Sequence, residues 1–117
     1  MSQSSKKPRF SIITVSYNHE QFIDQTIESV INQTYQDFEY LIVDGKSTDN
    51  SKKVIEKYSK NLKIKPIYQE SNEGAVSSLN EGFKNATGEI LCYINSDDFF
   101  LKEALQEVEN IFVNNPS

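Results

Sequence analysis

Short apolar runs alternate with amphipathic stretches four times along this 117-residue chain, and this alternation constrains the fold more than any other feature. The apolar runs cover residues 10–15, 38–43, 64–68 and 90–94. Unbroken runs of this kind are typical of strands buried on both faces of a parallel sheet. The stretches between them carry apolar side chains every three or four residues, which predicts helices that cover those faces.

Each predicted helix has an apolar stripe, and the first two also have a local start signal. Asn18 is the expected N-cap of the first helix, with Gln21 completing a capping box, and Ser47 or Thr48 is the expected cap of the second. Gly88 is expected to end the turn after the third helix. The stripes consist of Phe22, Ile23, Thr26, Ile27, Val30 and Ile31; Val54, Ile55 and Tyr58; Val76, Leu79, Phe83 and Ala86; and Leu101, Ala104, Leu105, Val108, Ile111 and Phe112.

The order of elements predicts an α/β fold with a doubly wound, mainly parallel four-stranded sheet. Right-handed crossovers leave few arrangements, and the simplest has the strand order 3-2-1-4, with the Pro66-containing strand at one edge. Ligands bind such sheets at the carboxyl ends of the strands, where the winding direction reverses. Three polar segments should therefore meet in one crevice: residues 16–18, Asp44 and residues 96–98.

Composition excludes several classes of protein. The net charge is −5 without a basic patch, which argues against nucleic-acid binding, and 37% hydrophobic residues are enough for a core. Cys92 is the single cysteine and His19 the single histidine, so neither a disulfide nor a His/Cys metal cluster can form. No apolar run reaches the length of a membrane span. Residues 1–9 are expected to be a disordered polar leader, and a reducing, cytoplasmic setting fits these features.

The adjacent carboxylates Asp97 and Asp98 are the strongest candidates for chemistry. Like charges at the end of a buried strand repel, and a divalent cation relieves that repulsion. Mg²⁺ and Mn²⁺ prefer oxygen ligands and characteristically bridge protein carboxylates to substrate phosphates. The alternative is that one of the two aspartates caps the fourth helix.

Other polar positions have weaker readings. Asp44 could accept hydrogen bonds from a base or ribose, and Gly45 permits a positive φ or close approach of a ligand, but residues 44–49 also suit a turn and helix cap. Tyr17 could stack on a base or simply pack on the first helix. Neither the dinucleotide-binding GxGxxG pattern nor the phosphate-binding Walker loop is present.

Three segments, taken in order and spacing, resemble the nucleotide-sugar half of a family 2 glycosyltransferase with the GT-A fold. They are SIITVSYN at 11–18, FIDQTIESVINQTYQDFEYLIVDGKSTDNS at 22–51 and ESNEGAVSSLNEGFKNATGEILCYINSDD at 70–98. The resemblance covers nearly all of residues 10–113. It implies that residues 10–117 form the nucleotide-sugar-binding part of an incomplete GT-A domain, without the C-terminal acceptor part.

The resemblance also implies individual roles. Asp98 matches the last carboxylate of a DxD-type motif, which binds Mg²⁺ or Mn²⁺ on the donor diphosphate, and Asp97 matches a contact to the donor ribose or phosphate. Val15 and Tyr17 match the loop around the base, commonly uracil, and Asp44 matches the acidic residue after the second strand. The remaining expected donor contacts are Gly45, Asn72, Gly74 and Asn80. Two departures are Asp44-Gly45, where many relatives have two acids, and Asn72-Glu73, where an acid and a base are common.

The same resemblance predicts an inverting transfer from a UDP-linked donor to a glycan or lipid-linked acceptor. The general base lies beyond residue 117 in that family, so no catalytic residue is assigned here, and the isolated chain is expected to bind donor with negligible transfer. Peripheral membrane association of a longer parent protein is compatible with transfer to such an acceptor. Alternatives are a receiver-like or other non-catalytic nucleotide-binding domain, and a nucleotidyltransferase. We also expect self-association through the exposed edge of the strand at 90–94.

Overall fold

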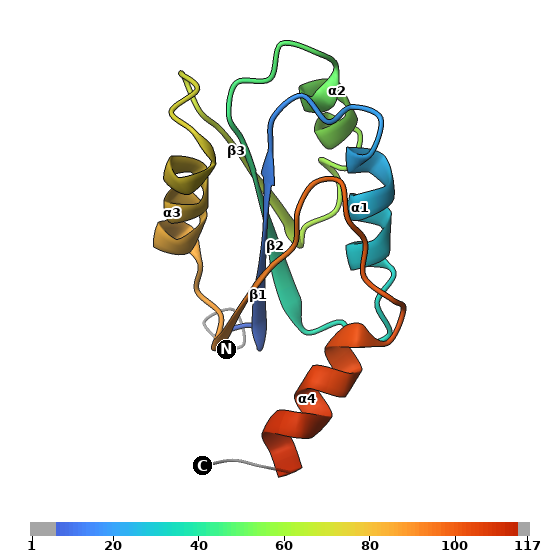
Figure 1. The fold of residues 1–117 in the computed structure, drawn as a ribbon. Helices are drawn as coiled ribbons and strands as arrows, with labels where there is room; N and C mark the ends of the chain where they lie inside the picture. The colour runs from blue at the N-terminus through green and yellow to red at the C-terminus, as the bar shows by residue number, and fades with distance from the viewer. Residues whose placement is uncertain (1–6, 115–117) are drawn as a thin grey trace.

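A computed structural model describes residues 7–114 of the chain, and its elements follow the predicted alternation of strands and helices (Figure 1). The elements are β1 (Phe10–Ser16), α1 (Ile23–Ile31), β2 (Phe38–Asp44), α2 (Ser51–Glu56), β3 (Ile64–Tyr68), α3 (Ala75–Asn85), β4 (Ile90–Tyr93) and α4 (Ala104–Asn114). The four strands are parallel and lie in the order β3-β2-β1-β4. The predicted sheet and its strand order are confirmed.

The register brings the carboxyl ends of the strands to one edge of the sheet. Ser16 pairs with Asp44, and Asp44 pairs with Tyr68, so β1, β2 and β3 end level with one another. The last paired residue of β4 is Tyr93, opposite Ile13, and the chain beyond it continues past the end of β1. Helices α1 and α2 cover one face and α3 covers the other (Figure 1).

The main core lies between the sheet and helices α1 and α2. Its fully buried members come from β1, β2, both helices and the start of α4: Phe10, Ile12, Ile23, Ile27, Val30, Tyr40, Ile42, Ile55 and Leu105. Every residue of β1 and β2 is buried, as predicted for central strands. Burying one such side chain stabilises the fold by about 1.5–3 kcal/mol.

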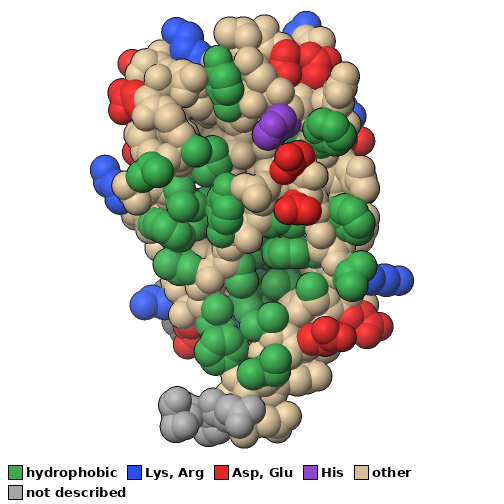
Figure 2. Space-filling view, in the orientation of Figure 1, with side chains coloured by type: hydrophobic (Ala, Val, Ile, Leu, Met, Phe, Trp, Pro, Cys, Tyr) green, Lys and Arg blue, Asp and Glu red, His purple; other side chains and the backbone are tan. Residues whose placement is uncertain are grey.

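Strand β4 does not have the two buried faces that its apolar sequence predicts. Leu91 is 51% exposed and Tyr93 is 43% exposed, while Ile90 and Cys92 are partly buried against the main core. The reason is geometric: β4 is an edge strand, and α3 packs on β1 and β2 rather than on β4. Hydrophobic side chains gather in patches on the face seen in Figure 2.

The apolar stripe predicted for α3 is wrong at Val76 and Phe83, whereas Leu79 and Ala86 are partly buried. Val76 is 73% exposed and Phe83 is 40% exposed, whereas the buried residues of α3 are Ser78 and Gly82. A Cβ atom on Gly82 would lie 2.7 Å from Cγ2 of Ile13, which is closer than a real contact allows. Small residues therefore bring α3 close to the sheet, and the larger apolar residues turn toward solvent.

Helix α4 is only partly packed. Leu105 is buried, but Leu101, Ile111 and Phe112 of the predicted stripe are exposed, and the helix projects beyond the sheet (Figure 1). No helix among residues 7–114 is long and apolar enough to cross a membrane. Most of the predicted leader, residues 1–6, lies outside the described residues. Within the described part, Arg9 forms ion pairs with Glu89 and Glu109.

Candidate functional site

The loops after β1 and β2 are joined by hydrogen bonds at the carboxyl edge of the sheet. Asn18 has a φ of 55°, and its Oδ1 accepts the N–H of Thr48 at 2.8 Å. The N–H of Asn18 donates to Oγ of Ser47 at 2.9 Å, and the N–H of His19 donates to Oγ of Ser51 at 3.0 Å. The two loops therefore form one connected surface beside the end of the sheet.

These bonds correct the predicted helix caps. Helix α1 begins after Phe22, not Asn18, and α2 begins after Asn50, not Ser47 or Thr48; neither start has a side-chain cap. Polar residues that resemble caps in sequence instead hold the neighbouring loop, about 30 positions away in the chain. The pattern of Ser, Thr and Asn is the same in both cases, so the sequence alone does not separate them.

Asp44 lies at the end of β2 and is only 2% exposed. Its carboxylate accepts the backbone N–H of Ser47 at 2.9 Å and the Ser47 hydroxyl at 2.6 Å. The carboxylate therefore stabilises the turn that follows β2, as the turn alternative for this segment anticipated. The positive φ expected at Gly45 occurs instead at Lys46, with a φ of 65°. Gly45 is buried, and its N–H donates to the carbonyl of Ser16 at 2.9 Å.

The segment that leads into α3 approaches the same edge. A Cβ atom on Gly45 would lie 3.8 Å from Oδ1 of Asn72 and 3.4 Å from Oγ of Ser78, so these side chains lie beside the end of β2. Gly74 has a φ of 96° and is the N-cap of α3; its N–H donates to Oδ1 of Asn72 at 3.1 Å. Asn80 is exposed on α3, and no hydrogen bond joins its side chain to another described residue.

Asp97 and Asp98 are both exposed just beyond the end of β4. Within residues 7–114, neither carboxylate forms a hydrogen bond or ion pair with the protein, although the Asp98 N–H donates to the Asn95 carbonyl at 3.1 Å. Helix α4 begins at Ala104, so the alternative in which either aspartate caps that helix is wrong. Both carboxylates are available to a ligand.

The described residues do not build a metal cage by themselves. No group of three or more His, Cys, Asp or Glu side chains in residues 7–114 is arranged to hold a metal ion. Two exposed carboxylates nevertheless fit one kind of metal binding. Mg²⁺ is commonly held by one or two carboxylates and completes its coordination with water and substrate phosphate. The donor set of Asp97 and Asp98 fits a cation that arrives with a phosphorylated ligand.

His19 connects the β1–α1 loop with the segment that carries the two aspartates. Its Nδ1 hydrogen-bonds Oγ of Ser96, which is 1% exposed, and acidic side chains lie beside the histidine on the surface in Figure 2. The two residues are 77 positions apart, so no local pattern predicts the contact. Tyr17, 40% exposed at the end of β1, leaves part of its ring open to a ligand.

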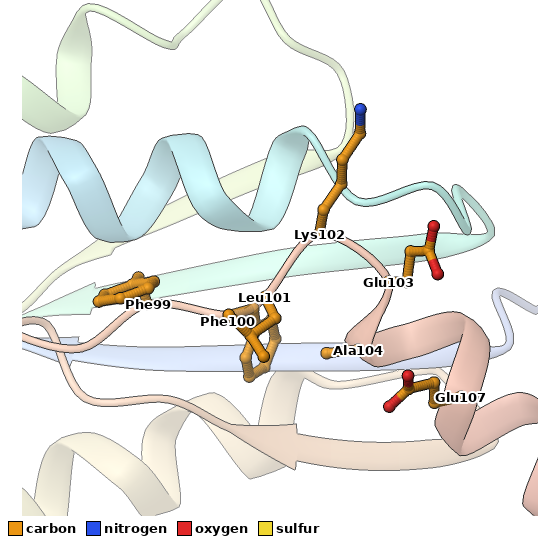
Figure 3. A pocket seen from close by; sticks show the side chains of 7 residues that line it. All are labelled: Phe99, Phe100, Leu101, Lys102, Glu103, Ala104 and Glu107. Carbon is orange, nitrogen blue, oxygen red and sulfur yellow. The ribbon is translucent and has the colours of Figure 1, made fainter.

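A hollow of about 420 Å³ lies further along the same segment (Figure 3). Its lining consists of Phe99, Phe100, Leu101, Lys102, Glu103, Ala104 and Glu107. None of these residues was expected to belong to the site. Leu101, predicted to face the core from α4, is 75% exposed because it precedes that helix.

The chain belongs to glycosyltransferase family 2, and the model of the family described as Glycosyl transferase family 2 matches residues 11–117. The sheet order and flanking helices are those of the GT-A fold. An uncharacterized glycosyltransferase, alr2836, from Nostoc sp. is 39% identical over 106 residues, covering 89% of this chain and 33% of the relative. The putative teichuronic acid biosynthesis glycosyltransferase TuaG from Bacillus subtilis is 35% identical over 102 residues, covering 86% of this chain and 40% of the relative.

Solved structures agree with this assignment. TarS 1-349 from S. aureus in complex with UDP-GlcNAc has a TM-score of 0.88 and 32% identity, covering 93% of this chain and 32% of that one. Mannosyltransferase PcManGT from Pyrobaculum calidifontis, in complex with GDP-Man and Mn²⁺, has a TM-score of 0.83 and 20% identity, which supports the fold alone. It covers 95% of this chain and 34% of that one. The chain thus spans 33% and 40% of the two curated relatives.

Proposed function

We propose that this chain is the donor-binding half of an inverting glycosyltransferase that uses a UDP-linked sugar with Mg²⁺ or Mn²⁺. The observation that carries the proposal is the exposed pair Asp97 and Asp98, which has no hydrogen bond or ion pair within residues 7–114. The pair follows the edge strand β4 and is linked through Ser96 to the loop after β1. Asp98 would bind the cation, and Asp97 would contact the ribose or a phosphate.

The base would lie at the ends of β1 and β2. Tyr17 is 40% exposed and would stack on the base, and Val15 lies two residues before it, in β1. Asp44 and Gly45 would shape the floor of this region, since the Asp44 carboxylate is already committed to Ser47. Asn72, Gly74 and Asn80 are proposed to contribute from the α3 side. TarS structures with UDP and with UDP-GlcNAc support the choice of donor class.

A bound cation would supply charge stabilisation for the departing diphosphate. The residues of this chain bind and orient the donor, and the general base that deprotonates an acceptor hydroxyl is proposed to lie beyond residue 117. The acceptor is proposed to be a glycan or lipid-linked glycan, and the 117-residue chain alone is expected to show negligible transfer. The family assignment favours glycosyl transfer over the receiver-like and nucleotidyltransferase alternatives.

Nucleotide preference tests the proposed donor. UDP and GDP are titrated separately into the purified chain with Mn²⁺, and UDP is expected to bind at least tenfold more tightly because the base site is proposed to fit uracil and to exclude the larger guanine. A Tyr17→Ala variant should weaken UDP binding by about 1–3 kcal/mol, the range for lost base stacking. Equal affinity for UDP and GDP would reject the uridine preference, and no binding of either would reject the donor site.

A second copy of the chain is proposed to pair with the outer edge of β4. Among the described residues this strand pairs only with β1, so its other side offers backbone that none of them pairs with, and Leu91 and Tyr93 add exposed apolar area. Sedimentation velocity over a range of concentrations should reveal dimers that Leu91→Lys abolishes. A monomer at every concentration would contradict the proposal.

A further inference from the structure

We infer that a row of polar side chains, on α1 and just beyond its C-terminal end, positions the two aspartates for the metal-bound donor. The relevant stretch, called here the acidic segment, comprises residues 94–103 between β4 and α4. It contains no helix or strand, and backbone hydrogen bonds anchor it near its two ends, from Ile94 to the Ile13 carbonyl and from Thr34 to the Lys102 carbonyl. It lies beside α1 in Figure 1, and side chains of that helix and of Gln33 just after it bond the stretch between these anchors.

The bonds run from the middle of α1 to just beyond its C-terminal end. Oγ1 of Thr26 lies 2.9 Å from the carbonyl oxygen of Ser96 and also contacts the carbonyl of Asp98. Oγ of Ser29 accepts the N–H of Phe100 at 3.0 Å. These contacts tie the main chain of the acidic segment to the helix on either side of the carboxylates.

Gln33 completes the row at the end of α1. Its Nε2 donates to the carbonyl of Leu101 at 2.6 Å, and its Oε1 accepts the N–H of Leu105 at 2.9 Å. Thr26 and Ser29 are three residues apart and share one face of α1, whereas Gln33 follows the helix, which ends at Ile31. Thr26 is fully buried and Gln33 is 2% exposed. Their polar groups are satisfied by the acidic segment together with helix carbonyls, since the Thr26 hydroxyl also lies 3.3 Å from the Phe22 carbonyl and Nε2 of Gln33 also donates to the Ser29 carbonyl.

The arrangement holds the backbone of Asp98 while leaving its carboxylate free. The Asp98 N–H bonds the Asn95 carbonyl, and the Asp98 carbonyl accepts from Thr26. A binding group that is held in place before the ligand arrives loses less conformational freedom on binding. Thr26, Ser29 and Gln33 are therefore positioning residues, not catalytic residues. This inference rests on the proposed donor site.

Thr26→Val tests the role of the row because it removes the hydroxyl and keeps the size of the side chain. Thr26→Ser is the conservative variant that restores the hydroxyl. Thr14→Val is the matched control: Thr14 is also fully buried, and its hydroxyl bonds the Tyr40 hydroxyl at 2.7 Å rather than the acidic segment. Hydrogen–deuterium exchange of residues 97–103 and calorimetric titration of UDP with and without Mn²⁺ are measured for all four proteins.

Thr26→Val is expected to speed local exchange about tenfold and to weaken UDP binding with Mn²⁺ about tenfold, with little change when chelator replaces Mn²⁺. Thr26→Ser should recover both values, and Thr14→Val should change neither. Unchanged exchange in Thr26→Val overturns the inference. Faster exchange with unchanged Mn²⁺-dependent binding also overturns it, because the row would then be only structural. If unmodified protein binds no UDP, the proposed donor site fails, and the exchange result alone decides whether α1 holds the segment.

Discussion

Replacing Glu39 should destabilise the fold in a graded, pH-dependent way. Glu39 belongs to β2, is 3% exposed, and accepts three hydrogen bonds. Oε2 accepts from the Ser11 hydroxyl and from the N–H of Thr87 at 2.6 Å, and Oε1 accepts from Nζ of Lys65 at 2.6 Å. One carboxylate therefore joins β1, β3 and the connection between α3 and β4.

The contacts of Glu39 predict which of three substitutions costs the most stability. Glu39→Gln can keep one oxygen toward Ser11 and Thr87 but replaces charge-assisted bonds by neutral ones, a loss of about 2 kcal/mol in the free energy of unfolding. Glu39→Ala removes the acceptor of the fully buried Ser11 hydroxyl and of the Thr87 N–H, and also removes packing, for a loss of about 4 kcal/mol. Lys65→Met should cost less than about 1 kcal/mol, since the Lys65 side chain is 52% exposed. Urea unfolding at pH 7 measures all three.

The pH dependence provides a second check on Glu39. Burial raises the pKa of Glu39, but hydrogen bonds from Lys65, Ser11 and Thr87 outweigh it, so the pKa lies below the ordinary 4.5. A lowered folded-state pKa contributes stability above the unfolded-state pKa, and this stability is lost as the pH falls through the folded-state pKa. The difference between wild type and Glu39→Gln should therefore shrink as the pH falls below 4.5. Equal stability at pH 7, or a difference that does not change with pH, would refute the reasoning.

Three further substitutions test packing and buried hydroxyls. Gly82→Ala should lower stability by about 1 kcal/mol, because overpacking against Ile13 outweighs the gain in helix propensity; a higher urea midpoint would contradict this. Tyr40→Phe should cost about 1 kcal/mol, since it removes the 2.7 Å hydrogen bond with Thr14. Tyr68→Phe should leave stability unchanged or raise it, because the buried Tyr68 hydroxyl has no hydrogen-bond partner among the described residues. Thermal unfolding of Tyr40→Phe and Tyr68→Phe should show opposite or unequal shifts of the melting temperature, and equal losses would contradict the comparison.

The sequence predicts the sheet well because its signals are local and its topology is restricted. Residues 10–15 and 38–43 have the apolar continuity of central strands, and both are buried throughout. Right-handed crossovers then leave few strand orders. The prediction of burial fails where burial depends on neighbouring elements. Residues 90–94 look like a central strand, but β4 lies at the edge of the sheet and has one face that α3 does not cover.

The site is predicted in outline but not in its connections. The polar segments at the ends of β1, β2 and β4 lie at one edge, as the topology requires. The bonds that hold them join residues about 30 to 77 positions apart, such as Asn18 with Thr48 and His19 with Ser96. Thr26 illustrates the limit: its spacing places it correctly on the buried face of α1, but its hydroxyl binds the acidic segment, which no periodicity reveals.

Calorimetric titration of UDP into the chain, with Mn²⁺ and then with chelator, tests the donor site most directly. It is performed on wild type, on Asp98→Ala, and on Asp37→Ala as a matched control. Asp37 is an exposed aspartate immediately before the first residue of β2, and it therefore lies at the end of the strand opposite to the proposed site. Mn²⁺-dependent binding in wild type and Asp37→Ala, and its loss in Asp98→Ala, is the predicted result. UDP binding that is unaffected by chelator and by Asp98→Ala, or no UDP binding by the wild type, would contradict the account.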